Sequence, residues 1–103
     1  MKTILIGYDD TEPSKHALVR AAEIAKAFGA QVHVTSVAPM LVGAPRAMGP
    51  YDPAEMILEV ADQVDADLIV LGTGERSLLE HALGMSVSGA VSRKAHRDVL
   101  IVH

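Results

Sequence analysis

Short apolar runs alternate along this chain with stretches in which apolar residues recur at helical spacing. Four runs have the length of strands: TILIGYDD from residue 3, QVHVTSV from residue 31, DLIVLGT from residue 67 and DVLIVH from residue 98. The first and third are continuously apolar, which predicts strands buried on both faces of a sheet. The second is rich in β-branched residues.

Three helices are predicted between these strands, over residues 11–29, 52–67 and 86–96. Pro13 lies near the start of the first helix, which Asp10 or Thr11 would cap, and Gly29 lies where its C-terminal cap belongs. Asp52 and Ser86 are the expected N-caps of the other two helices.

The resulting order is strand, helix, strand, loop, helix, strand, helix, strand, which predicts parallel strands with crossover helices. The loop is the irregular segment 38–51, rich in proline and glycine. We therefore expect one α/β domain over residues 1–103, an open parallel sheet of four strands flanked by three helices in three layers, as in flavodoxin-like folds.

Composition narrows the classes of function. The net charge is −4 and only 3% of residues are aromatic, which argues against nucleic acid as a partner. The absence of cysteine excludes disulfides, thiol catalysis and zinc-thiolate sites. No apolar run approaches the length of a membrane span, and the first residues lack the features of a secretion signal. We expect a soluble cytoplasmic domain with no membrane contact.

The candidate site follows from the predicted topology. Open parallel sheets bind ligands beyond the carboxyl ends of their strands, at the point where the strand order reverses. We expect the first and third strands to be central neighbours, so that Asp9 and Gly72 flank one crevice. The remaining candidates are the strand-end residues Ser36, Val37, Thr73 and Gly74, the cation Arg76, and Ser86 and Val87 at the start of the last helix, whose N–H groups suit phosphate.

Other interpretations of these residues have weaker support. Gly72 and Gly74 match only the first part of a dinucleotide fingerprint, and no P-loop sequence is present. Asp9 and Asp10 could form a metal-binding pair, or they could serve the start of the first helix. A phosphoacceptor receiver would need a further aspartate and a lysine at strand ends where this chain has neither. The five histidines show no ligand spacing, so no metal site is expected.

Two blocks of the sequence resemble the universal stress protein family. The opening ILIGYDDTEPSKHAL is similar to the family's first strand and helix. The final fifty residues, from DPAEMILEVADQVDADLIVLGT through GTGERSLLEHALGMSVSGAVSRKAHRDVLIV, resemble its third helix, fourth strand, nucleotide loop, last helix and last strand. The resemblance implies an adenine-nucleotide alpha-hydrolase-like fold.

This chain departs from the family in length. Family members carry a helix and a strand where this chain has the loop 38–51, so the resemblance implies a shortened member lacking the second helix and third strand. The family strand order 3-2-1-4-5 would become 2-1-4-5. Because the lost strand is an edge, the sheet stays continuous. One face then keeps a single helix, and the loop or a partner subunit would cover the apolar surface left there.

A second departure lies in the nucleotide loop. Nucleotide-binding members carry G-x-x-G-x9-G-[S/T], in which Gly72 and Ser86 match the first glycine and the hydroxyl residue. Glu75 and Met85 replace the other two glycines. Gly74 and Gly84 each lie one residue early, so a slip of one residue would restore two glycines.

The resemblance implies a stress-response binding module that holds ATP or another adenine nucleotide, with Mg²⁺ as an optional companion. It also implies a homodimer formed through the last strand, Val99–Val102, an uncharged run at an exposed sheet edge. Two alternatives stay open: a scaffold domain with a degenerate phosphate loop, and a slow ATP hydrolase. No catalytic residue is assigned.

Overall fold

The structure is a computed structural model, and it describes residues 1–36, 53–72 and 87–103. Several predictions lie outside these residues: the loop 38–51 and the N-caps Asp52 and Ser86. Five candidate site residues also lie outside them, namely Val37, Thr73, Gly74, Arg76 and Ser86.

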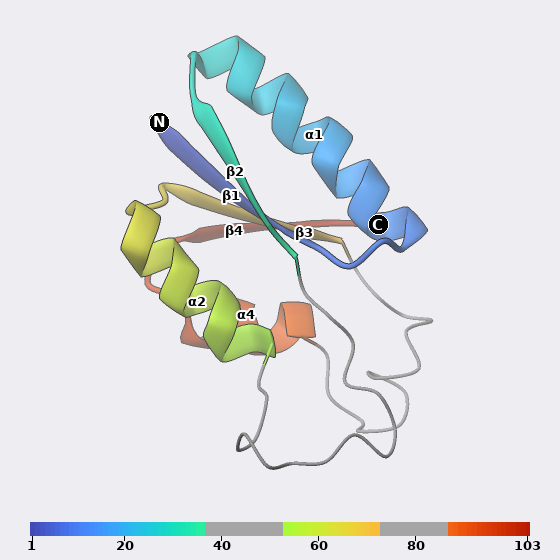
Figure 1. Cartoon of the computed structure of the whole chain (residues 1–103), viewed down its shortest axis with the longest axis vertical. Helices are drawn as coiled ribbons and strands as arrows, with labels where there is room; N and C mark the ends of the chain where they lie inside the picture. Colours follow the sequence, from blue (N-terminus) through green and yellow to red (C-terminus); the bar gives the residue numbers. More distant parts are fainter. Residues whose placement is uncertain (37–52, 73–86) are drawn as a thin grey trace.

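The described elements alternate as the sequence predicts (Figure 1). In chain order they are β1 (Thr3–Tyr8), α1 (Glu12–Phe28), β2 (Gln31–Ser36), α2 (Pro53–Val64), β3 (Leu68–Gly72), α4 (Val87–Lys94) and β4 (Asp98–Val102). All strand pairs are parallel, and the strand order is β2-β1-β3-β4. This order confirms the predicted four-stranded sheet, in which the first and third strands are central neighbours.

Helix α1 begins and ends where local sequence chemistry predicts. Thr11 is its N-cap, and the Thr11 hydroxyl accepts a hydrogen bond from the backbone N–H of Ser14 at 3.3 Å. Gly29 ends the helix in the left-handed conformation, with φ of 66°, where a side chain would be strained. The prediction that Asp10 or Thr11 caps this helix therefore resolves to Thr11.

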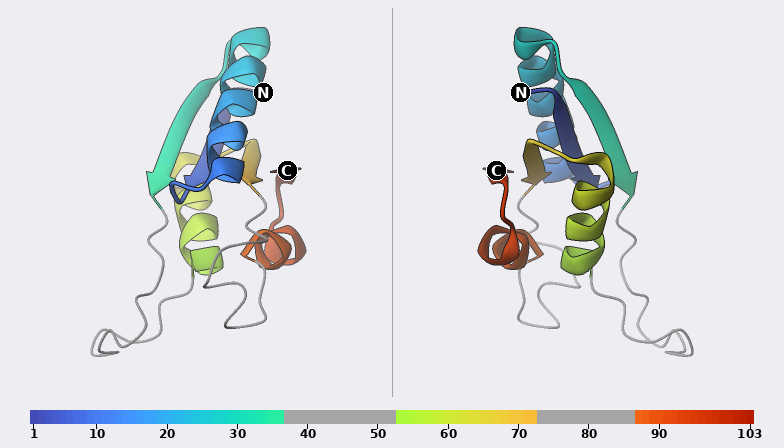
Figure 2. Two further views of the ribbon diagram at one scale, coloured as in Figure 1. Left: turned by 90° about the vertical axis from the view of Figure 1, so that its right-hand side faces the viewer. Right: turned by 90° about the vertical axis from the view of Figure 1, so that its left-hand side faces the viewer.

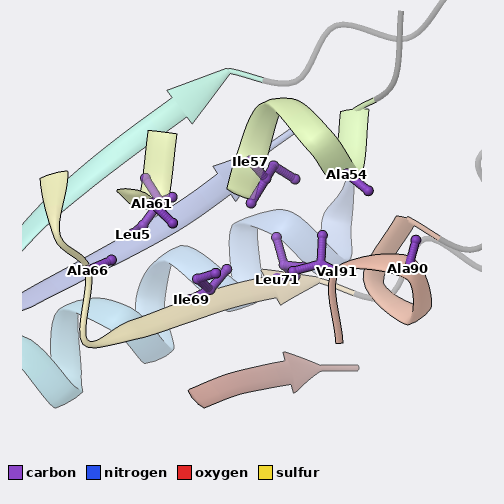
Figure 3. Packing of buried hydrophobic residues seen from close by; sticks show 9 residues of the cluster. All are labelled: Leu5, Ala54, Ile57, Ala61, Ala66, Ile69, Leu71, Ala90 and Val91. Carbon is purple, nitrogen blue, oxygen red and sulfur yellow. The ribbon is translucent and has the colours of Figure 1, made fainter. Parts of the chain in front are cut away.

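The helices form layers on both faces of the sheet (Figure 2). On one face, α1 packs over Ile4, Ile6 and Val70. On the other face, α2 and α4 enclose the larger cluster shown in Figure 3, with Leu5 and Ile69 from the sheet. Among the described residues one face thus carries a single helix, as predicted.

Burial differs sharply between central and edge strands. Four consecutive residues of β1 and four of β3 are buried, whereas no residue of β2 or β4 is. Val34 of edge strand β2 is 54% exposed. The central strands therefore contribute most of the apolar burial that stabilises the fold.

Two sets of polar side-chain contacts link neighbouring segments near the amino ends of the strands. Asp67 Oδ2 accepts hydrogen bonds from the backbone N–H groups of Lys2 at 2.7 Å and Thr3 at 2.9 Å. The Arg97 guanidinium donates to Asp62 Oδ1 at 2.9 Å and to the carbonyl of Ala66 at 2.7 Å, so it ties β4 to the end of α2. The hydrogen bond to Asp62 raises the pKa of Arg97 above its ordinary range.

Asp67 predicts a pH dependence of stability. The two backbone hydrogen bonds lower the pKa of Asp67 below its ordinary value, so ionised Asp67 favours the folded state at neutral pH. This contribution is lost as pH falls through the ordinary carboxyl range toward the lowered folded pKa. We expect Asp67→Asn to be less stable than the native chain at neutral pH, with the difference vanishing in acid. Urea unfolding from about pH 7 to pH 2 measures it.

The matched control is Glu59→Gln, which removes a carboxylate from an exposed position of α2. Its stability should follow that of the native chain across the same pH range. A constant difference between Asp67→Asn and the native chain at every pH would contradict the assigned role of the ionised carboxylate.

No helix in the described segments of the chain is long and apolar enough to cross a membrane.

Candidate functional site

The carboxyl ends of three strands lie side by side and form the candidate site (Figure 1). Tyr8 of β1 pairs with Ser36 of β2, and Gly7 pairs with Leu71, the residue before Gly72 in β3. The structure therefore brings Asp9, Ser36 and Gly72 to one edge of the sheet, as predicted.

Asp9 belongs to the turn that starts α1. Its Oδ1 atom accepts hydrogen bonds from the backbone N–H of Thr11 at 3.2 Å and from the Thr11 hydroxyl at 2.5 Å. Thr11 in turn caps the helix through Ser14. The part-buried Asp9 carboxylate is thus held at a fixed position beside the ends of the strands.

Asp10 faces a different partner. Its backbone is left-handed, with φ of 63°, and its Oδ1 accepts a hydrogen bond from the hydroxyl of Tyr8 at 3.1 Å. Burial, and then this hydrogen bond, raise the pKa of Tyr8. Asp9 and Asp10 therefore engage separate partners, and no group of three metal-ligating side chains occurs among the described residues. In the sequence, the only sign of this contact of Tyr8 is the place of the residue at a strand end.

Gly72 has a packing role that the sequence did not reveal. A Cβ atom at this position would lie 2.4 Å from the carbonyl carbon of Pro13 and 2.6 Å from the backbone N of Ser14. Glycine therefore lets the end of β3 contact the first turn of α1 directly. This contact keeps the Asp9 turn against the end of β3.

The amino end of α4 is the remaining described part of the site. Val87 is its first residue, and Ser88 beside it is buried. Val87 packs against the core cluster that contains Leu71, near the end of β3. Helix amino ends carry a positive partial charge that favours anions. The geometry thus combines a fixed carboxylate, a strand-end hydroxyl, a glycine edge and a helix amino end.

This arrangement defines a class of protein: α/β domains with an open parallel sheet, which as a class bind ligands beyond the carboxyl ends of their strands. The sequence model described as the universal stress protein family matches residues 1–51 and 47–103. The chain belongs to the universal stress protein family. The two matches overlap at residues 47–51, within the loop 38–51 where the shortening is predicted.

Sequence similarity to individual proteins supports the family assignment. Universal stress protein MJ0531 of Methanocaldococcus jannaschii is 35% identical over 91 residues, which cover 88% of this chain and 46% of that protein. The chain spans less than half the length of the curated relatives it matches.

Solved structures show the same fold. A universal stress protein in complex with cAMP has a TM-score of 0.72 and 31% identity, covering 99% of this chain and 96% of that one. The universal stress protein of Archaeoglobus fulgidus in complex with dAMP has a TM-score of 0.67 and 20% identity, covering 100% and 98%. The fold is the expected adenine-nucleotide alpha-hydrolase-like architecture.

Proposed function

We propose that this protein is a stress-response binding module that holds an adenine nucleotide at the carboxyl ends of its strands. The observation that carries the proposal is the meeting of Asp9, Ser36 and Gly72 at one edge of the sheet. Support comes from the similar structure solved with cAMP. The described geometry supplies binding groups rather than an assembled nucleophile and base.

The charges at the site suggest where each part of the nucleotide would bind. The Asp9 carboxylate suits a hydroxyl or amino donor, so we place the adenosine between Asp9 and Ser36–Val37. The phosphates belong along Gly72, Thr73 and Gly74 and at the Ser86–Val87 helix start, where the positive end of the helix dipole favours anions. Arg76 is the proposed phosphate cation, and Mg²⁺ would accompany ATP.

Calorimetric titration tests this proposal. AMP, cAMP, ADP and ATP, each with and without Mg²⁺, are titrated into the native chain and into Asp9→Asn. The substitution removes the charge but keeps an oxygen acceptor for Thr11, so the helix cap survives. Losing a charged hydrogen bond should weaken the nucleotide by about tenfold or more.

Glu59→Gln is again the control, because it removes a charge from an exposed position of α2. It should bind as the native chain does. Equal affinity of Asp9→Asn and the native chain would remove Asp9 from the site. The absence of a heat of binding for every nucleotide at millimolar concentration would refute the proposal.

The hydrogen bonds from Thr11 to Asp9 favour one alternative, because they give this carboxylate a structural role without any ligand. In that case the protein is an interaction domain with a degenerate phosphate loop. Binding that occurs only after Met85→Gly would assign it to this class. Phosphate release from ATP that Asp9→Asn abolishes would instead indicate slow hydrolysis.

The proposal includes a cytoplasmic homodimer formed through Val99–Val102. In the described sheet β4 pairs with β3 alone and forms an edge, so a second copy could extend the sheet there.

A further inference from the structure

The outer face of α1 carries a regular pattern of exposed charged residues around one valine. The helix turns Ser14, Ala17 and Ala21 toward the sheet, and Figure 2 shows α1 as the outer layer on its side of the molecule. A stripe of exposed side chains runs along the opposite face: Glu12, Lys15, Val19, Glu23 and Lys26. Their spacing of three and four residues places them in line on a helix with 3.6 residues per turn.

This stripe is self-complementary. On the amino side of Val19, the positive Lys15 comes first and the negative Glu12 lies further out. On the carboxyl side the signs are reversed, with the negative Glu23 first and the positive Lys26 further out. If two such helices cross antiparallel at Val19, Glu12 of one copy faces Lys26 of the other. Lys15 likewise faces Glu23, so all four charges on each copy meet an opposite charge.

Val19 supplies an apolar centre. Its side chain is 59% exposed, although valine is a poor helix former and gains nothing from solvent there. Leu18 and Ala22 beside it are also exposed. An apolar centre with charged ends is the usual anatomy of a protein–protein contact.

Some of the charged side chains on α1 also form ion pairs within one chain. Lys15 and Glu12 lie 3.5 Å apart, as do Arg20 and Glu23, and both pairs are largely exposed. Exposed pairs at this spacing contribute little to stability, so their groups can be shared with a second helix at small cost.

We propose that the outer face of α1 binds the same face of a second copy of this chain, antiparallel and with Val19 at the two-fold axis. This contact is separate from the nucleotide site and from the β4 edge, and it does not depend on the proposed function.

Cysteine crosslinking tests the two-fold axis. The native chain has no cysteine, so Val19→Cys introduces a single thiol. Two thiols at the axis should form an intermolecular disulfide under mild oxidation, about tenfold faster than two Ala27→Cys thiols. Ala27 is the matched control, because it is exposed on the same helix but off the stripe. Both variants are also made with Ile101→Lys, so that pairing through β4 does not contribute. Equal crosslinking at the two positions would overturn the proposal.

Charge exchange tests the pairing. Lys15→Glu with Lys26→Glu makes the stripe negative, and Glu12→Lys with Glu23→Lys makes it positive. Both variants also carry Ile101→Lys, so that pairing through β4 does not contribute. Each alone should associate about tenfold more weakly than the Ile101→Lys chain, and a mixture of the two should restore association. Light scattering measures this, and circular dichroism checks that each variant is folded. The contact would be refuted by a mixture that stays monomeric. It would also be refuted by an Ile101→Lys chain with its α1 face unchanged that shows no association at high micromolar concentration.

Discussion

Gly72→Ala is expected to destabilise the protein by about 3 kcal/mol or more, because the added methyl group meets backbone rather than flexible side chains. The Cβ would lie 2.5 Å from the carbonyl oxygen of Pro13 and 2.6 Å from the backbone N of Ser14. These atoms belong to the first turn of α1, so the helix start must move away from β3. Urea unfolding monitored by circular dichroism measures the loss.

Gly7→Ala is the matched control in the neighbouring central strand. Its Cβ would approach Leu71 Cδ2 at 2.8 Å and Ile57 Cδ1 at 3.2 Å, which are the ends of side chains that can shift. We expect a smaller loss of about 1–2 kcal/mol. Equal losses for the two variants would show that the contact of Gly72 with α1 is not decisive.

The same substitution has a consequence for the site. Moving the first turn of α1 displaces Thr11, which holds Asp9 through two hydrogen bonds. Any nucleotide affinity should therefore fall in Gly72→Ala, but not in Gly7→Ala, when both are compared under conditions where they are fully folded.

Ile101→Lys is expected to weaken pairing through β4 strongly. Val99–Val102 forms an uncharged sheet edge, and a lysine in an edge strand opposes pairing with another strand. Ile101 pairs with Leu71 in register, is only half-buried and belongs to neither described core cluster, so the fold should tolerate the change. We expect the dimer to weaken by about a hundredfold, or about 2.7 kcal/mol.

Light scattering across micromolar concentrations measures this change, with Ile101→Val as the control that keeps an apolar edge. The control should associate as the native chain does. A native chain that shows no association through this edge, or an Ile101→Lys variant that associates unchanged, would contradict the proposed β4 dimer.

The sequence predicted the elements well because their signals are local. Continuous apolar runs identified β1 and β3 as buried strands, and Gly29 marked the end of α1. The alternation of elements then predicted the parallel sheet, and the family resemblance supplied its order. Part of the site was predicted in the same way, because strand ends in a parallel sheet share one edge.

The sequence by itself determined the class of fold, the caps of α1 and the strand ends at which Asp9, Ser36 and Gly72 meet. Only the tertiary structure decided what these and other residues contact. It placed Gly72 against Pro13, and it directed Asp67 to the backbone of Lys2, 65 positions away. Periodicity and capping act within a few residues of the chain, whereas these contacts arise from how the strands and α1 pack together. For that reason no local sequence pattern predicted these contacts.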